Sequence, residues 1–278
     1  MLSGLRATPA SVVVLAASTL VASHVTACRE ARRAEPRTPN EIRETLFAEL
    51  QPVTLANCEL QRVGGPNDGG YLMCGNLLGT PEAAYSYGIG SDDEWGCEVS
   101  NRLGVAVHEY DCFDPKRPMC EAWHLAFHDE CVGPAAETVE GRVFDTIANQ
   151  IVRNGHAGTT LLMKMDIEGA EWDSLLQTPD EVLARIDQLA MELHGVDERR
   201  YIEVVRKLKR TFHLVHRHFN NYGCQSGIEP FPSFAYQVLW VNKRIGVPDL
   251  SAGPPRLPQP MDAPDNPRAP DCQQPILK

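Results

Sequence analysis

Short apolar runs alternate with amphipathic stretches through the middle of the chain. The apolar runs, each long enough for one strand, are 83–89, 105–111, 124–132, 160–166 and 188–194. Helical patterns separate most of them, at 94–103, 142–154, 170–177 and 197–210. Strands that alternate with helices predict a doubly wound α/β sheet, and continuously apolar strands predict burial on both faces of a parallel sheet.

The last two apolar runs, 211–219 and 234–242, break this alternation. The segment between them has the composition of a loop and shows no helical period. A parallel crossover needs a dozen or more residues that are usually helical, so this pair is predicted to be antiparallel. The expected sheet is therefore mostly parallel, with a C-terminal antiparallel hairpin.

The N-terminal 28 residues differ from the rest of the chain. They have a short cationic start, an apolar stretch at 11–22 and small residues before Cys28. This pattern is typical of a secretory signal, and "VTAC" also resembles the lipobox of bacterial lipoproteins. A retained membrane anchor is the alternative, although the apolar stretch is short for one. We therefore expect an exported or membrane-anchored protein.

The flanks of the central region are also predictable. Residues 29–50 form a linker and a short helix, which Thr38, Pro39 and Glu41 open with a capping-box pattern. Residues 246–278 contain nine prolines and little apolar periodicity, a composition that predicts a disordered tail. The main domain is expected to span 51–245.

Charge and cysteine content narrow the class of protein. The 278 residues carry a formal net charge of −11, and no cluster of lysine and arginine offers the basic face that nucleic acid requires. Apart from Cys28, the cysteines are even in number, which predicts disulfides in an exported chain, with buried free thiols as the alternative. No CxxC pair occurs, so a zinc site is disfavoured. These cysteines are Cys58, Cys74, Cys97, Cys112, Cys120, Cys131, Cys224 and Cys272.

Glycines and carboxylates follow the first strand of the predicted sheet. Gly88 and Gly90 lie at a strand-to-helix turn, where a cofactor can approach the backbone. A dinucleotide fingerprint would place a third glycine where Asp93 stands, and Asp92 and Glu94 add two more carboxylates at the helix start. Such a helix start repels a pyrophosphate. The loop therefore favours a cofactor without phosphate, and simple helix capping is the alternative role of these acids.

The next strands also end in carboxylates. Asp111 lies 21 residues after Gly90 (111 − 90), close to the spacing of about 20 at which an acid meets ribose hydroxyls. Glu109 and Asp114 are its rivals for that role. Asp129 closes the third strand, where it faces either an adenine or solvent.

The fourth strand ends in the densest charge cluster of the sequence. The stretch "MKMDIEGAEWDSL" (163–175) places Lys164, Asp166, Glu168 and Glu171 where the apolar run stops. Because ligands bind at the carboxyl ends of strands where the strand order reverses, this cluster is expected to border a ligand site. Asp and Glu at a sheet edge are usually solvated, so we assign no metal.

The same stretch, extended to "LLMKMDIEGAEWDSLL", resembles the FkbM-type methyltransferases, whose fourth strand ends in a K-x-D-x-E-G-A-E motif. Further segments are similar to the subgroup that includes the methyltransferase-like protein 24 family, and the resemblance spans about residues 55 to 243. The acidic "SDDEW" (91–95) departs from the family pattern. The similar segments are 62–74, 85–95, 191–195 and 236–242.

The resemblance implies a class I methyltransferase fold and S-adenosylmethionine as methyl donor. It implies a hydroxyl of a sugar, glycan or small metabolite as acceptor. From the N-terminal pattern alone, membrane contact is expected only through that segment. An acceptor hydroxyl loses its proton as the methyl group transfers, so a base helps, although positioning alone can suffice. The candidate bases are Asp166, Glu168 and His194, with a structural histidine as the alternative for the last. The implied cofactor contacts are Tyr87, Gly88, Gly90, Asp111, Asp129 and Asp166.

Two further expectations concern the turn "NDGGYL" (67–72) and the competing functions. The turn joins two extended pieces, and a Cys58–Cys74 bridge would pin it as a flap over the cofactor. An exported binding module that keeps the fold without catalysis is the alternative function. An NAD-dependent enzyme is disfavoured by the acidic loop and the terminal hairpin.

Overall fold

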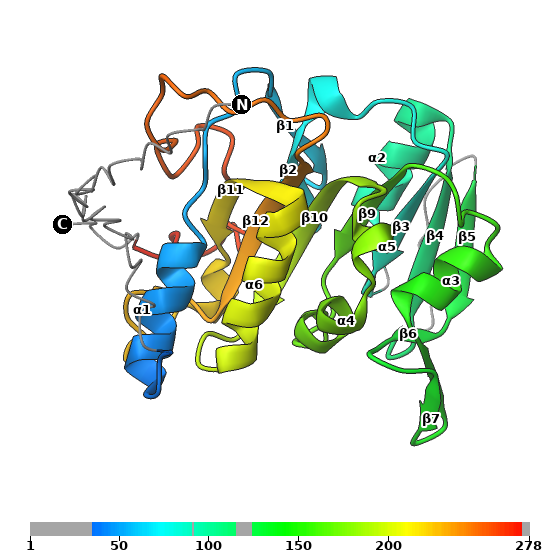
Figure 1. Cartoon of the computed structure of the whole chain (residues 1–278), viewed down its shortest axis with the longest axis horizontal. Helices are drawn as coiled ribbons and strands as arrows, with labels where there is room; N and C mark the ends of the chain where they lie inside the picture. Colours follow the sequence, from blue (N-terminus) through cyan, green and yellow to red (C-terminus); the bar gives the residue numbers. More distant parts are fainter. Residues whose placement is uncertain (1–34, 91, 115–123, 274–278) are drawn as a thin grey trace, which may run out of the picture. The chain divides into compact units, whose positions relative to one another are not determined.

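A computed structural model describes residues 35–90, 92–114 and 124–273, and the compact unit begins at Pro36 (Figure 1). The predicted signal segment, residues 1–28, lies outside the described residues. Within the described ranges, no helix has the length and apolar character to cross a membrane.

A seven-stranded sheet forms the centre of this unit, in the order β11-β12-β10-β9-β3-β4-β5. Neighbouring strands pair in parallel except β12, which runs antiparallel to both β10 and β11. This confirms the predicted α/β sheet, mostly parallel with an antiparallel C-terminal pair. The strands are β3 (Ala83–Tyr87), β4 (Ala106–Asp111), β5 (Leu125–Asp129), β9 (Leu161–Met165), β10 (Ile186–His194), β11 (Phe212–Phe219) and β12 (Ala235–Asn242).

Helices cover both faces of the sheet (Figure 1). Side chains of β3 and β9 alternate between two apolar clusters, with Tyr85 and Met163 on one face and Ala84 and Leu162 on the other. The first face packs against all helices except α2, which covers the second with the hairpin described below. The helices are α1 (Pro39–Glu49), α2 (Glu94–Leu103), α3 (Ile147–Arg153), α4 (Glu171–Gln177), α5 (Asp180–Leu183) and α6 (Arg199–Thr211).

The predicted turn at 67–72 joins an antiparallel hairpin of β1 (Leu60–Gly64) and β2 (Gly70–Cys74). A disulfide links Cys58 to Cys74, as the flap hypothesis supposed. Together with Cys112–Cys131 and Cys224–Cys272, it indicates an oxidising, extracellular-type environment. A short 3-10 turn, η1 (Gly75–Leu77), follows the hairpin, and η2 (Asn221–Gly223) follows β11.

The predicted helix at 142–154 is wrong in its first part. Residues Arg142–Asp145 form strand β8, and α3 begins only at Ile147, after the Thr146 cap. A small sheet of order β6-β8-β7 pairs β8 with β6 (Cys131–Val132) and β7 (Glu137–Val139). Valine and phenylalanine at 143–144 favour a strand, and the turn at 140–141 lets that strand fold back on β7.

The predicted disorder of the C-terminal tail does not hold for residues 246–273. This segment lies against β11 and β12, on the face that carries α2, and its carboxylates meet buried polar side chains of the two strands. Buried imidazole and amide groups need hydrogen-bond partners, so polar contacts order a segment that has few apolar residues. The contacts are His216 Nε2 to Asp262 Oδ1 at 2.8 Å, Gln237 Nε2 to Asp265 Oδ1 at 2.7 Å, and His218 Nε2 to Asp271 Oδ2 at 3.0 Å.

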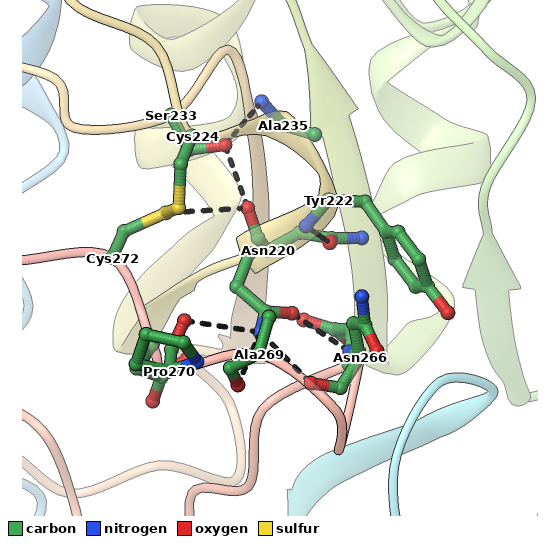
Figure 2. The surroundings of a disulfide bond; sticks show 12 residues. Asn220, Tyr222, Cys224, Ser233, Ala235, Asn266, Ala269, Pro270 and Cys272 are labelled. Carbon is green, nitrogen blue, oxygen red and sulfur yellow. Dashed lines mark hydrogen bonds between the residues drawn. A yellow bond between two sulfur atoms is a disulfide. The ribbon is translucent and has the colours of Figure 1, made fainter.

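The Cys224–Cys272 disulfide ties the tail to the loop after β11 (Figure 2). Beside it, the amide nitrogen of Asn221 lies within hydrogen-bond distance of three tail carbonyls, at 3.0 to 3.2 Å. Its amide oxygen accepts from the backbone N–H of Asn266 at 2.7 Å. The side chain of Asn221 thus provides hydrogen-bond partners for four backbone groups of the tail.

The tail gives stability a pH dependence that Asp265→Asn is expected to reduce. Burial, then the charges of Glu192 and Asp68, raise the pKa of Asp265 to about 8, while Arg62 opposes the shift. A carboxyl whose pKa is higher in the folded state binds its proton more tightly there, so the free energy of unfolding falls as pH rises from about 4 to about 8.

The amide that replaces the carboxyl does not ionise, so the variant does not lose stability in this way as pH rises. At pH 8 we expect the Asp265→Asn variant to be more stable than the wild type by about 1 to 3 kcal/mol, and near pH 4 we expect the two proteins to be equally stable. Urea unfolding at both values measures it. Glu109, whose pKa burial also raises to about 8, contributes equally to both proteins and cancels. An identical pH slope in the two proteins would contradict the buried position of Asp265.

Candidate functional site

A cavity of about 820 Å³ opens at the carboxyl ends of β3, β4 and β9. Strand order reverses there, because β3 is followed along the chain by β4 on one side, whereas its other neighbour is β9. Seven of the lining residues are acidic and one, Lys164, is basic. The acidic residues are Asp68, Asp92, Glu94, Asp111, Asp114, Asp166 and Glu168.

The loop after β3 forms the floor of the cavity and uses glycine for a packing reason. Gly88 has φ +72°, and a Cβ there would lie 1.6 Å from the carbonyl oxygen of Asp166. Gly90 has φ +55° and open space around it. The Lys164 ammonium is buried and donates to the carbonyl oxygen of Gly88. The lysine of the predicted motif therefore fixes the glycine loop.

Asp111 anchors the same loop from the end of β4. Its Oδ2 accepts from the backbone N–H groups of Ile89 at 3.1 Å and Gly90 at 2.9 Å. Its Oδ1 accepts from those of Phe113 at 2.8 Å and Asp114 at 3.0 Å. Asp111, the residue predicted to bind a ribose, thus lines the cavity and also fixes the backbone of two loops that border it.

The start of α2 is already occupied by carboxylates. Asp93 caps the helix, with its Oδ1 accepting from the backbone N–H of Gly96 at 2.9 Å, and Glu94 follows in the first turn. Asp92 and Glu94 line the cavity beside the cap. Capping, the alternative role, is confirmed for Asp93, and the site that a pyrophosphate would take carries negative charge.

Asp166 follows β9 and connects the cavity to the hairpin. Its Oδ2 accepts from the hydroxyl of buried Tyr71 at 3.0 Å, and its backbone N–H donates to the carbonyl of Tyr87 at 2.9 Å. Glu168 has φ +56°, an uncommon backbone conformation for a residue other than glycine, and its side chain is 85% exposed. Such conformations concentrate at functional sites.

His194, at the end of β10, lies beside the cavity at the centre of four carboxylates. Its Nδ1 is 2.9 Å from Oε1 of Glu171. Its Nε2 is 3.4 Å from Oε1 of Glu192, 3.5 Å from Oε2 of Glu168 and 3.9 Å from Oδ1 of Asp166. Burial alone would lower the pKa of His194, but its bonds to Glu171 and Glu192 raise it to about 11. A pKa raised in this way argues against a general base at neutral pH.

Two other groups at the site bind protons more tightly than usual. Burial and the charge of Asp166 raise the pKa of Asp68. Burial also raises the pKa of Glu192, and Asp166 adds to the shift while His194 opposes it. Burial is the largest cause of both shifts.

The structure brings five of the predicted site residues to the cavity and leaves three outside its lining. Gly88, Gly90, Asp111, Asp166 and Glu168 line it. His194 lies just behind, whereas the Tyr87 side chain stacks on Tyr110 in the core and Asp129 is exposed on β5. Of the rivals to Asp111, Asp114 lines the cavity and Glu109 is buried away from it.

Sequence reasoning missed Glu192 and Tyr71. Glu192 stands two residues before His194, so both side chains point to the same face at the end of β10. A carboxylate inside the apolar run "QLAMELH" was the available signal, because buried strands rarely carry an unpaired charge. Tyr71 carried no comparable signal, since its contact with Asp166 joins positions 95 residues apart.

Comparison with known proteins adds little. No protein-family model matches the chain, and no curated protein matches it. A protein of Thermoplasma acidophilum with a known crystal structure is 11% identical, with 64% of this chain and 83% of that chain covered and a TM-score of 0.32. Similarity at that level carries no argument about function.

Proposed function

We propose that the protein is an S-adenosylmethionine-dependent methyltransferase of the FkbM type, which methylates a hydroxyl of a sugar or small metabolite. The observation that carries this proposal is the acidic cavity over the Gly88–Gly90 loop, at the point where strand order reverses. Ligands bind at such points in doubly wound sheets. A donor that carries a sulfonium and an ammonium but no phosphate suits this negative charge, whereas NAD does not.

The architecture supports the same assignment. A parallel sheet that ends in an antiparallel pair is typical of class I methyltransferases, and β10, β12 and β11 have that arrangement. The cofactor would lie over Gly88 and Gly90. Asp111 or Asp114 would accept from its ribose hydroxyls, because both line the cavity.

The reaction places few demands on the protein, because the donor is already activated. The acceptor oxygen forms a bond to the methyl carbon while the carbon–sulfur bond breaks and its electron pair stays on sulfur. The hydroxyl proton must pass to a base. Asp166 and Glu168 are the candidates, since both line the cavity, whereas His194 already carries a proton.

Calorimetric titration of S-adenosylmethionine, with NAD as comparison, tests the cofactor. We expect micromolar binding of S-adenosylmethionine alone by the full-length protein with its disulfides intact. Asp111→Ala leaves the amides of Ile89 and Gly90 without their acceptor, so affinity should fall by at least about 100-fold, or about 2.7 kcal/mol. Asp197→Ala is the matched control, because that carboxylate is half exposed and pairs with Arg43 away from the cavity.

Turnover on a panel of sugars and small alcohols follows, with Asp166→Asn and Glu168→Gln compared to identify the base. Folded protein that fails to bind S-adenosylmethionine would refute the proposal. Tight binding without turnover on any acceptor would favour the alternative, an exported binding module on the same fold.

A further inference from the structure

Asp166, Glu192 and His194 converge from two neighbouring strand ends. Asp166 follows β9, and the other two lie on β10, which pairs with β9 in parallel. Each offers one ligand atom, and these atoms all lie within 4.8 Å of one another. Glu192 is buried and the other two side chains are half-buried, and this mixed nitrogen and oxygen donor set distinguishes the group from an acidic patch at the surface.

The two separations from His194 match those between ligands of one metal ion. Two atoms bound about 2.1 Å from one ion lie about 3.0 Å apart at a right angle and about 4.2 Å apart when opposite. His194 Nε2 is 3.4 Å from Glu192 Oε1 and 3.9 Å from Asp166 Oδ1. Both distances fall inside that range.

Each of the three side chains is also held in place through another contact. Metal-binding histidines usually donate their second ring nitrogen to a carboxylate, and His194 Nδ1 meets fully buried Glu171 at 2.9 Å. Tyr71 donates to Asp166 Oδ2 at 3.0 Å, and Asn220 donates to Glu192 Oε1 at 2.7 Å. These contacts orient the donor set and leave Nε2 of His194 3.9 Å from Oδ1 of Asp166.

Among the described residues, one carboxylate oxygen of the group is buried without a hydrogen-bond partner. The Glu192 side chain is only 4% exposed, and within the described ranges no hydrogen-bond partner reaches its Oε2. Burying carboxylates without counter-charge is costly, and a divalent ion removes that cost.

We propose that Asp166, Glu192 and His194 bind a divalent metal ion of the Mn²⁺ or Zn²⁺ type, which would replace the proton on Nε2 of His194 and release it to solvent. Two carboxylates with one imidazole suit these borderline ions better than Mg²⁺ or Ca²⁺, which prefer oxygen alone. The binding site stands on this geometry alone. Its role rests on the proposed function: Asp166 also lines the cavity, so the ion would bind the acceptor hydroxyl and lower its pKa. With Asp166 on the metal, Glu168 is the residue that accepts the proton.

Metal binding to chelator-treated, full-length protein tests the site without any turnover. We expect one equivalent of MnCl₂ or ZnCl₂ to bind with a Kd near or below about 10 μM in calorimetry, and MgCl₂ at least about 10-fold more weakly. Glu192→Gln should weaken Mn²⁺ binding by at least about 100-fold, because it removes a charged ligand. Glu203→Gln removes a carboxylate from the exposed side of α6 and should leave binding unchanged.

Pulsed electron paramagnetic resonance of bound Mn²⁺ provides a second readout. Nitrogen modulation from one imidazole is expected in the wild type and should be absent in His194→Gln. The proposal is overturned if folded wild-type protein fails to take up Mn²⁺ or Zn²⁺ at about 1 mM, well above the Kd expected of such a site. It is also overturned if Glu192→Gln binds as the wild type does, or if bound Mn²⁺ shows no nitrogen. If Glu192→Gln does not fold, the wild-type measurements decide.

The two proposals fail in distinguishable ways. Metal uptake without S-adenosylmethionine binding would support the metal site and refute the methyltransferase. If chelator-treated protein binds S-adenosylmethionine but takes up no metal, the methyltransferase proposal is supported and the metal site is refuted.

Discussion

Gly88→Ala is expected to destabilise the protein by about 3 to 5 kcal/mol, since the left-handed backbone and steric overlap each contribute. A Cβ at this position would lie 1.6 Å from the carbonyl oxygen of Asp166 and 2.6 Å from its carbonyl carbon. Both are backbone atoms, and the same peptide is tied to β3 through the bond from Asp166 N–H to the Tyr87 carbonyl. The overlap can be relieved only by separating β3 from β9 at the floor of the cavity. Urea unfolding and S-adenosylmethionine titration should both show the loss.

Gly90→Ala is the matched control within the same loop. Gly90 has φ +55°, and a Cβ added there would meet nothing within 4 Å beyond its own chain neighbours, so only the backbone strain of about 1 to 2 kcal/mol applies. This variant should fold while its methyl group projects toward the ligand. Equal destabilisation by the two substitutions would contradict the contact between Gly88 and the Asp166 peptide.

The double variant Cys224→Ser/Cys272→Ser is expected to lose about 4 kcal/mol of stability, as the chain-entropy relation gives for a cross-link of this span. The two cysteines are 48 residues apart, so their bond restricts the unfolded chain strongly. Without it, the polar contacts described above remain between the tail and β11 and β12. Urea unfolding under non-reducing conditions measures the loss, and hydrogen exchange at His216 to His218 should rise.

The single variants provide the control for this prediction. Cys224→Ser and Cys272→Ser each remove the same bond, so each should lose as much as the double variant, and the losses should not add. Additive losses, or a double variant as stable as the wild type, would show that the cross-link does not hold the tail.

The central sheet was predictable because each strand has its own apolar run in the sequence, and such runs recur along the chain. Every strand of the central sheet coincides with an apolar run in the sequence, and the loop composition of 220–233 predicts the antiparallel partner β12. The helix predicted at 142–154 failed because a four-residue strand, β8, borders α3 with only Thr146 between them. Periodicity over so few residues cannot separate the two elements.

The tail was not predictable from composition, because the surface that orders it lies elsewhere in the chain. A proline-rich segment usually cannot bury enough apolar area to fold. Here the compensating groups are polar side chains buried on β11 and β12, such as His218 and Gln237. Their presence in strands that are otherwise apolar was the only sign that a partner segment exists.

The position of the candidate site was predictable from the sequence, but the set of residues that line it was predictable only in part. Carboxyl ends of parallel strands meet at one edge, so Gly88, Asp111 and Asp166 were expected together, and the cavity contains all three. Side-chain direction decides the rest. Tyr87 turns into the core and Asp129 toward solvent, a choice that strand position alone does not determine.

The spacing of the disulfides described above has a consequence for biosynthesis. Cys58–Cys74 and Cys112–Cys131 close loops of 16 and 19 residues, so each pair can meet soon after it leaves the ribosome. Cys224 must wait until a further 48 residues have emerged, during which earlier cysteines are available as wrong partners. Since reshuffling takes seconds to hours depending on the oxidant and isomerase present, the compartment in which the chain folds should decide the yield of correctly paired protein.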